Sequence, residues 1–306
     1  MHTDDDEDDD KDNTMSPLPP APECPDLPRL HYRVWDFRRK LLTVTALLVL
    51  ESSIVPICLF YGLWYRTTLS HGAIVAIVTA FFGLYTIYDH SLRSWKLLFS
   101  PRRADYHPLG QTSRWHLDYT HFTLTFGYII MAGLLTGACV PAEPVVRALA
   151  MPMPVFLVQL GAQLLYHGAL DALRRPTPFR VSSVGRGQRC VPLVYTFVED
   201  VVAVDGNGTR DFRAALRERY RASRRFRALL RRLNWLWGAG GVAVGVATLV
   251  VVWTVPQEVA YGVGWLAPLI FVGVWTWVTI HHARASVRRE RLGWAAEWRG
   301  GQVEMM

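Results

Sequence analysis

Residues 176–232 have the sequence PTPFRVSSVGRGQRCVPLVYTFVEDVVAVDGNGTRDFRAALRERYRASRRFRALLRR. This polar, arginine-rich segment interrupts a strongly apolar chain, with four long apolar blocks before it and two after it. A helix that spans a bilayer needs about 20 mostly apolar residues, and each block reaches that length. The sequence therefore predicts an all-α integral membrane protein: a bundle of six transmembrane helices with a cytosolic or interfacial amphipathic helical insert between spans 4 and 5.

The apolar blocks divide the chain into five parts. The predicted spans cover residues 41–65, 69–88, 119–140, 145–169, 233–255 and 259–280. The parts are an acidic tail (1–28), spans 1–4 (29–175), the arginine-rich loop (176–232), spans 5 and 6 (233–280) and a basic tail (281–306). The acidic tail contains six prolines and cannot bury enough apolar surface to offset its ordering entropy, so we expect it to be disordered.

Charge is distributed unevenly and predicts the orientation. Residues 1–28 carry ten acidic groups and one lysine, a net charge of −9, so the rest of a chain with net charge +7 carries +16. The connection between spans 1 and 2 contains Arg66 as its basic residue, that between spans 3 and 4 contains Arg147, and that between spans 5 and 6 contains none. The other flanks are rich in arginine and lysine. The positive-inside rule then places both termini and both long connectors in the cytosol, at the plasma membrane or an endomembrane. We expect an anionic cytosolic leaflet as the partner and no nucleic acid.

The 176–232 loop is predicted to contain two amphipathic helices. In the first, apolar residues recur as adjacent pairs every four positions, with Thr196, Glu199 and Asp200 between them. Pro192 is placed at its start, and residues 205–208 (Asp-Gly-Asn-Gly) are placed at its end. The pattern indicates a short amphipathic helix, with Glu199 and Asp200 on its polar face.

The second helix is expected to run from Thr209 to Leu233 and to contain ten arginines. Its apolar stripe predicts either a helix in the bilayer interface or packing on the protein's own helices. A protein partner at residues 192–232 is a further possibility. The residues expected to bind lipid or a partner are Arg213, Arg217, Arg221, Arg224, Arg225, Arg231 and Arg232.

Three polar residues fall inside predicted spans. Glu51 lies ten residues into span 1, and Gln159 and Gln163 reach a similar depth in span 4. A carboxyl group facing lipid is costly, so Glu51 is expected to face the bundle. One hypothesis is a protonated Glu51 that hydrogen-bonds to one of the two glutamines; the other is a functional role in ion or proton transport.

The cytosolic ends of four spans carry imidazoles and carboxylates. Such groups could bind a metal or transfer protons. Histidine and aspartate are also common at helix ends in the headgroup layer, which is the simpler explanation. The candidate catalytic residues are Asp89, His90, His121, His167, Asp171, His281 and His282.

No nucleotide-binding or nucleophile-elbow motif occurs, and the four cysteines form no CxxC pair. The sequence therefore predicts no metal site and no cofactor, although a haem between two histidines stays open. Gly241 and Gly245 form a GxxxG step, which favours close helix packing within the bundle over dimerisation. The oligomeric state is left open.

Several stretches resemble an uncharacterised family of polytopic membrane proteins of filamentous fungi. They are residues 178–183 (PFRVSS), 199–206 (EDVVAVDG), 212–213 (FR), 219–220 (RY) and 226–227 (FR). The chain departs from the family where Ser223 is followed by arginine rather than proline. The resemblance implies a eukaryotic membrane protein and contributes no catalytic residues. The leading hypothesis is a non-catalytic membrane protein whose loop docks on the bilayer or a partner; the alternatives are an enzyme with a His/Asp site and a small transporter centred on Glu51.

Overall fold

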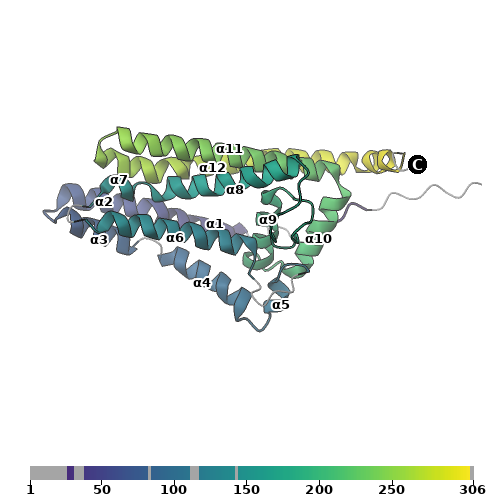
Figure 1. The fold of residues 1–306 in the computed structure, drawn as a ribbon, viewed down its shortest axis with the longest axis horizontal. Coiled ribbons are helices and arrows are strands. Elements are labelled where there is room, and N and C mark those ends of the chain that lie inside the picture. The colour runs from purple at the N-terminus through teal and green to yellow at the C-terminus, as the bar shows by residue number, and fades with distance from the viewer. Residues whose placement is uncertain (1–25, 31–37, 82–83, 111–116, 142–143, 304–306) are drawn as a thin grey trace, which may run out of the picture.

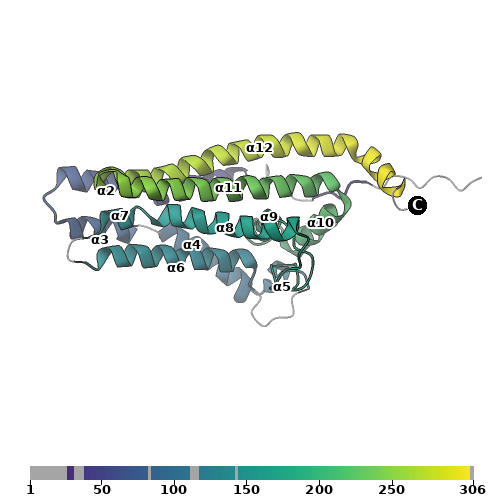
Figure 2. The ribbon, with the colours of Figure 1, turned by 45° about the horizontal axis from the view of Figure 1, so that its top comes forward.

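The computed structural model describes residues 26–30, 38–81, 84–110, 117–141 and 144–303. Within these ranges the chain is helical and contains no strand, only two isolated β-bridges. The long helices run side by side along one axis and form an elongated bundle (Figures 1 and 2). The all-α fold class is therefore confirmed.

The helices follow the predicted apolar blocks. α1 (Arg38–Val49), the π-helical η2 (Leu50–Ile54) and α2 (Val55–Arg66) form one uninterrupted helical path through the first block. α3 (His71–Phe81) and α4 (Leu84–Leu98) cover and extend the second block, and α5 (Arg103–Tyr106) follows. The remaining bundle helices are α6 (Tyr119–Cys139), α7 (Val146–Leu149), α8 (Pro152–Ala172), α11 (Arg224–Thr254) and α12 (Gln257–Val303).

Four helices of the described chain are long and apolar enough to cross a membrane. They are α6, α8, α11 and α12, the last over Gln257–Trp294. They correspond to predicted spans 3 to 6. The first two blocks are divided into shorter helices.

The glycines of α8 and α11 allow these two helices to pack closely. A Cβ added at Gly161 would lie 2.8 Å from the backbone nitrogen of Val242, and one at Gly245 would lie 2.9 Å from the backbone oxygen of Pro154. Backbones approach this closely only where the side chain is absent. The prediction that the GxxxG step packs within the bundle is confirmed.

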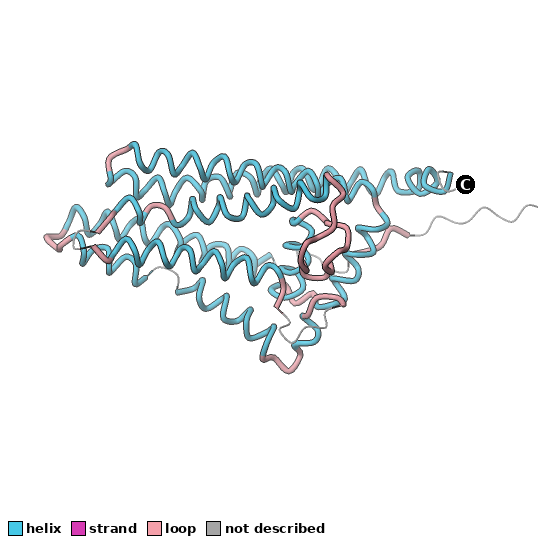
Figure 3. The backbone as a smooth tube through the Cα atoms, viewed as in Figure 1, coloured by secondary structure: helices cyan, strands magenta, loops and turns pink. Residues whose placement is uncertain are grey.

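The insert lies at one end of the bundle. It consists of loop 173–192 and three helical segments, α9 (Leu193–Asp200), η3 (Val201–Asp205) and α10 (Thr209–Ala222). Figure 3 shows most of the pink loop segments gathered at this end, between the helices of the bundle and α10. The predicted start after Pro192 and the predicted stop at residues 205–208 agree with the structure.

One predicted helix boundary was wrong. The second insert helix does not continue to Leu233 but breaks at Ser223, which has extended backbone and whose hydroxyl accepts a hydrogen bond from the Phe226 N–H, capping α11. The helix that contains predicted span 6 extends beyond residue 280, as α12 to Val303. It is held beside the insert by an ion pair of 2.6 Å between Glu290 and Arg219.

Candidate functional site at the insert end of the bundle

The polar face of α9 points into the protein. Thr196, Glu199 and Asp200 have an exposed fraction of 0%, whereas Val198 and Val201 are 36% and 44% exposed. The sequence pattern placed the three polar side chains on one face of the helix and did not specify whether that face is buried. The reason is that charged and hydroxyl groups from α6, the loop before α9 and α10 meet the polar face of α9, so its burial is compensated.

Arg213 of α10 lies at the centre of this buried network. Its Nη1 is 2.6 Å from Asp200 Oδ1 and 3.2 Å from Glu199 Oε1, and its Nη2 is 3.6 Å from Asp118 Oδ2. Nη2 also donates to the backbone oxygen of Tyr106 at 3.1 Å. All three carboxylates and the guanidinium are fully buried. Arg213 is therefore not available to lipid, which corrects the sequence prediction for this residue.

Arg93 of α4 extends the network to the bundle. Its Nη2 donates to Asp118 Oδ2 at 2.6 Å, and its Nη1 pairs with Asp205 at the end of η3. Asp118 also caps α6, because its Oδ1 accepts from the His121 N–H at 2.7 Å. The network thus joins α4, α6, α9, η3 and α10.

Hydroxyl groups complete the network. Asp200 Oδ2 accepts from Ser182 Oγ at 2.6 Å and from Thr120 Oγ1 at 2.8 Å, and Ser183 donates to Glu199 Oε1. The two serine hydroxyls also accept backbone N–H groups of Tyr119 and Leu109. Ser182 has a φ of 47°, in the left-handed region, which makes it part of the tight turn that presents both hydroxyls.

Negative charge exceeds positive charge in the network. In the described part of the chain, the carboxyls of Asp118, Glu199, Asp200 and Asp205 pair with two guanidinium groups, those of Arg93 and Arg213, and Lys96 is a further cation near Asp205. Burial, with the neighbouring Asp200 as a smaller cause, raises the pKa of Glu199 to about 7. Burial also raises the pKa of Asp205 to about 6, and that of Asp200 is raised. The network therefore retains protons as the pH approaches neutrality.

Two of the predicted histidines come together. The rings of His90 and His121 stack with centroids 4.5 Å apart and an angle of 11° between their planes. His90 Nε2 is 3.0 Å from Thr125 Oγ1. Asp89 is exposed on α4 beside this pair.

The other candidates lie elsewhere. His167 packs against Tyr119, with ring centroids 5.4 Å apart, and Asp171 accepts from Arg231 Nε at 2.8 Å. The ring of His281 contacts that of Trp277, with centroids 4.4 Å apart and an angle of 47° between their planes, and His282 follows on α12. No group of three or more histidine, cysteine, aspartate or glutamate side chains suited to a metal ion occurs in the described part of the chain. The predicted constellation does not assemble into one site there.

Glu51 has a different partner from the one expected. It lies in the π-helical segment η2, and its Oε2 accepts from both the backbone N–H and the hydroxyl of Thr86, at 3.1 and 3.2 Å. Gln159 donates to the Thr123 backbone oxygen at 3.2 Å, and Gln163 accepts from the Thr123 hydroxyl at 2.9 Å. The hypothesis of a bond between Glu51 and a span-4 glutamine was wrong, because both glutamines bind α6 instead.

The remaining predicted arginines fall into two groups. Arg224, Arg225 and Arg232 are exposed at the start of α11. Arg217, Arg221 and Arg231 line a half-open pocket of about 530 Å³.

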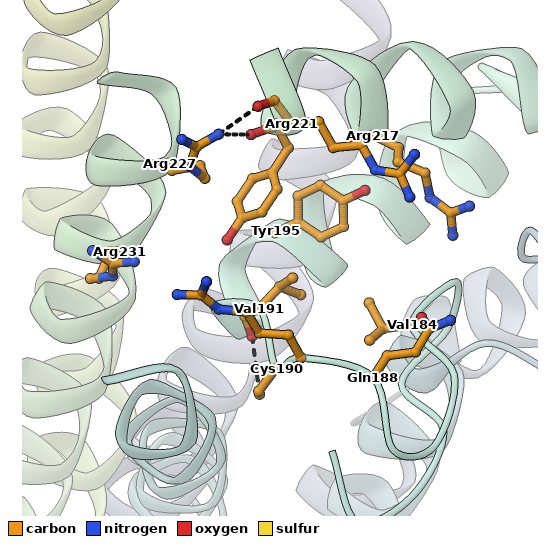
Figure 4. A pocket seen from close by; sticks show the side chains of 11 residues that line it. Val184, Gln188, Cys190, Val191, Tyr195, Arg217, Arg221, Arg227 and Arg231 are labelled. Carbon is orange, nitrogen blue, oxygen red and sulfur yellow. Dashed lines mark hydrogen bonds between the residues drawn. The ribbon is translucent and has the colours of Figure 1, made fainter. Parts of the chain in front are cut away.

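The pocket lies between loop 184–191, α9, α10 and the first turns of α11. Figure 4 shows Arg227 and Arg231 on one side, Arg217 on the other and Tyr195 between them. Two lining arginines, Arg189 and Arg227, were not predicted. Arg189 lies in a loop, and Arg227 does not disturb the apolar stripe of its helix. Apart from their charge, nothing in the sequence marks either residue as part of a pocket.

Comparisons with known proteins give the family and no activity. Neither the curated proteins nor the solved structures contain a match to this chain. A family model described as a domain of unknown function (DUF8766) matches residues 15–294, which is well over half of the chain. The chain therefore belongs to the DUF8766 family.

Proposed function

We propose that the protein is a six-span integral membrane protein of the plasma membrane or an endomembrane, with both termini in the cytosol. Its insert docks on the anionic cytosolic leaflet, and its role is non-catalytic. The resemblance to membrane proteins of filamentous fungi supports a eukaryotic membrane. The basic flanks of the apolar blocks support the orientation.

The first two apolar blocks support two further spans beside the four long helices. The path α1–η2–α2 is about 43 Å long at 1.5 Å per residue, which exceeds the hydrocarbon thickness of about 30 Å. α3 and α4, with 11 and 15 residues, lie on either side of residues 82–83. Side chains on both paths face outward, including Ile54 and Ile87, with exposed fractions of 47% and 63%. Exposed aliphatic side chains on such helices suit a lipid environment.

One observation carries the docking proposal: the insert exposes apolar side chains beside exposed arginines, while Glu199 and Asp200 of α9 are buried. Val198 and Val201 face outward, and the apolar stripe of α10, including Phe212 and Leu216, packs on Phe226 of α11. Exposed arginines lie in loop 173–192, on α10 and on α11. A segment with exposed apolar side chains and arginines, at the end of an apolar bundle, has the chemistry of an interface-bound element.

Fluorescence quenching tests the docking. A dye is attached at Val198→Cys or, as a control, at the exposed Asp211→Cys, in protein that lacks the four natural cysteines. In nanodiscs of anionic lipid we expect doxyl-labelled lipids to quench the dye at position 198 and aqueous iodide to quench it at position 211. Replacing Arg224, Arg225 and Arg232 with glutamine should remove any difference between anionic and neutral discs. Iodide quenching of both sites to the same extent would refute the docking.

Labelling with a membrane-impermeant maleimide tests the topology. In right-side-out sealed vesicles, Thr68→Cys in the turn after α2 should react from outside. Arg186→Cys in the insert should react only after permeabilisation. The reverse pattern would overturn the orientation, and equal labelling of both sites would overturn the span count.

A further inference from the structure

The pocket of the insert contains an unusual excess of positive charge. Its eleven lining residues include five arginines and no acidic residue. The arginines are Arg189, Arg217, Arg221, Arg227 and Arg231. Elsewhere the structure pairs buried arginines with carboxylates, as at Arg93, Arg213 and Arg219. The pocket therefore has five guanidinium groups in its lining and no carboxylate in the lining to pair with them.

The contacts of these arginines show how many charges stay uncompensated. Arg231 is paired with Asp171 at 2.8 Å. Arg217 donates to the Ser183 backbone oxygen at 2.7 Å, and Arg227 donates to the backbone oxygens of Tyr220 and Arg221 at 2.8 and 2.7 Å. Carbonyl groups orient a guanidinium without neutralising it, so these side chains are held in place with their charge intact.

The two other arginines have no anchor in the protein. Within the described chain, the guanidinium groups of Arg189 and Arg221 make no hydrogen bond or ion pair. Four of the five charges in the pocket thus lack a carboxylate. Like charges gathered in one pocket repel one another, water and salt reduce that repulsion, and a bound anion removes it.

The rest of the lining consists mainly of hydrogen-bond donors and apolar surface. The rings of Tyr195 and Tyr220 lie 4.9 Å apart. Burial raises the pKa of Tyr220 to about 12 and raises that of Tyr195, so both phenols stay protonated and can donate. Gln188 carries the one side-chain amide of the lining. The hydroxyl groups and the amide can each accept as well as donate, but the guanidinium groups that dominate the lining only donate, and phosphate groups need donors alone.

We propose that this pocket binds a compact, multiply phosphorylated polyol, either free or as the headgroup of a phosphoinositide lipid. Several phosphates are needed because Arg217 lies on the opposite side of the pocket from Arg227 and Arg231 (Figure 4). The volume of about 530 Å³ lies within the range of small-molecule sites. The lipid form rests on the proposed docking of the insert, whereas the free form requires only that the pocket exists.

Binding measurements on the full-length protein test the proposal. The probes are inositol hexakisphosphate, titrated by calorimetry into protein in neutral nanodiscs, and nanodiscs that contain phosphatidylinositol 4,5-bisphosphate. The test variant is Arg189→Gln with Arg221→Gln, which removes the two unanchored guanidinium groups. The matched control is Arg186→Gln with Arg210→Gln, because these arginines are exposed on the same two segments, lie outside the pocket and change the net charge equally.

We expect saturable binding that weakens by on the order of tenfold for each arginine removed in the test variant and changes little in the control. Binding of the soluble probe identifies a site for free polyphosphate, and binding confined to the lipid probe identifies a headgroup site that depends on docking. Absence of saturable binding to both probes, or equal losses in test and control variants, would overturn the proposal.

If the test variant does not fold, chemical protection of the wild-type protein tests the same proposal. Wild-type protein is treated with an arginine-specific glyoxal, with and without inositol hexakisphosphate or the lipid probe. Protection of Arg189 and Arg221, with continued labelling of Arg186 and Arg210, supports the pocket. Equal protection of all four arginines would contradict it. Docking is scored separately by the quenching experiment at position 198, so the failure of one proposal is distinguishable from the failure of the other.

Discussion

Replacing Arg213 with glutamine should release the insert from the bundle. The side chain is fully buried, and it contacts Asp200 at 2.6 Å, Glu199 at 3.2 Å and Asp118 at 3.6 Å. Glutamine retains a polar group of moderate size and removes the charge. The variant leaves these carboxylates with Arg93 as the remaining cation in contact with the network.

The expected cost is large because the network already contains more carboxylates than cations. Removing one partner of a buried ion pair typically costs about 3–5 kcal/mol. Part of this cost is avoided when Glu199 or Asp200 takes up a proton, since loss of the guanidinium raises the pKa of both. We therefore expect about 3 kcal/mol at pH 8 and a smaller cost at pH 5.

Limited proteolysis at residues 206–208 measures this opening. The protease must not cut at arginine, so that the substitution leaves its cleavage sites unchanged. If cleavage follows local opening, a cost of about 3 kcal/mol raises the cleavage rate on the order of a hundredfold. The control is Arg210→Gln, because Arg210 is exposed on the same helix and has the same charge. The reasoning is refuted if the two variants are cleaved at the same rate.

Three further variants test other contacts. Because the pKa of Glu199 is raised from 4.5 to about 7, the folded insert binds a proton more strongly than the unfolded chain in that interval, so its resistance to the protease should fall as the pH rises from 4.5 to 7. Glu199→Gln should make this profile less steep, with the remainder due to Asp200 and Asp205, and the exposed Glu218→Gln should leave it unchanged. A wild-type profile that rises with pH would contradict the assignment. Ser223→Ala should reduce the stability of the first turn of α11 by about 1 kcal/mol, because it removes the N-cap hydrogen bond. The loss should appear as faster hydrogen exchange at residues 224–226, and unchanged exchange would show that the cap contributes nothing. Gly161→Ala should lower the free energy of unfolding in detergent by about 1–3 kcal/mol, because the added Cβ meets the α11 backbone. Gly133→Ala is the control, since its Cβ meets nothing within 4 Å. Equal melting temperatures of the two variants in thermal unfolding would exclude close packing of α8 on α11.

The sequence predicted the helices well because long apolar runs and capping residues are local signals. Span 3, expected at residues 119–140, is α6 over Tyr119–Cys139, with Asp118 as its cap. The packing of the GxxxG glycines could also be predicted, since small residues at that spacing let two helix backbones approach closely. The break at Ser223 was missed because the apolar stripe continues through it, and only the cap geometry ends α10 there.

The candidate site was harder to predict because its members are far apart in the chain. Arg93 and Asp205 are 112 positions apart and meet only through the fold. The cytosolic-end histidines shared a predicted depth, but depth does not fix which helices are neighbours. His90 and His121 meet, whereas His167 lies beside Tyr119. The pocket arginines could not be separated from the other arginines of the insert by charge alone.

The orientation of α9 has a consequence for reading membrane-protein inserts. Hydrophobic periodicity identifies which side chains share a face, but it does not say which face is buried. In water the apolar face is buried, because its exposure is what costs free energy. Where one side of a helix meets lipid, exposed Val198 and Val201 cost little, and the polar face can be buried against complementary charges. The buried guanidinium–carboxylate network therefore acts beside the apolar cluster of α9, α10 and α11, and it explains why residues as hydrophilic as Glu199 and Asp200 hold this insert to its bundle.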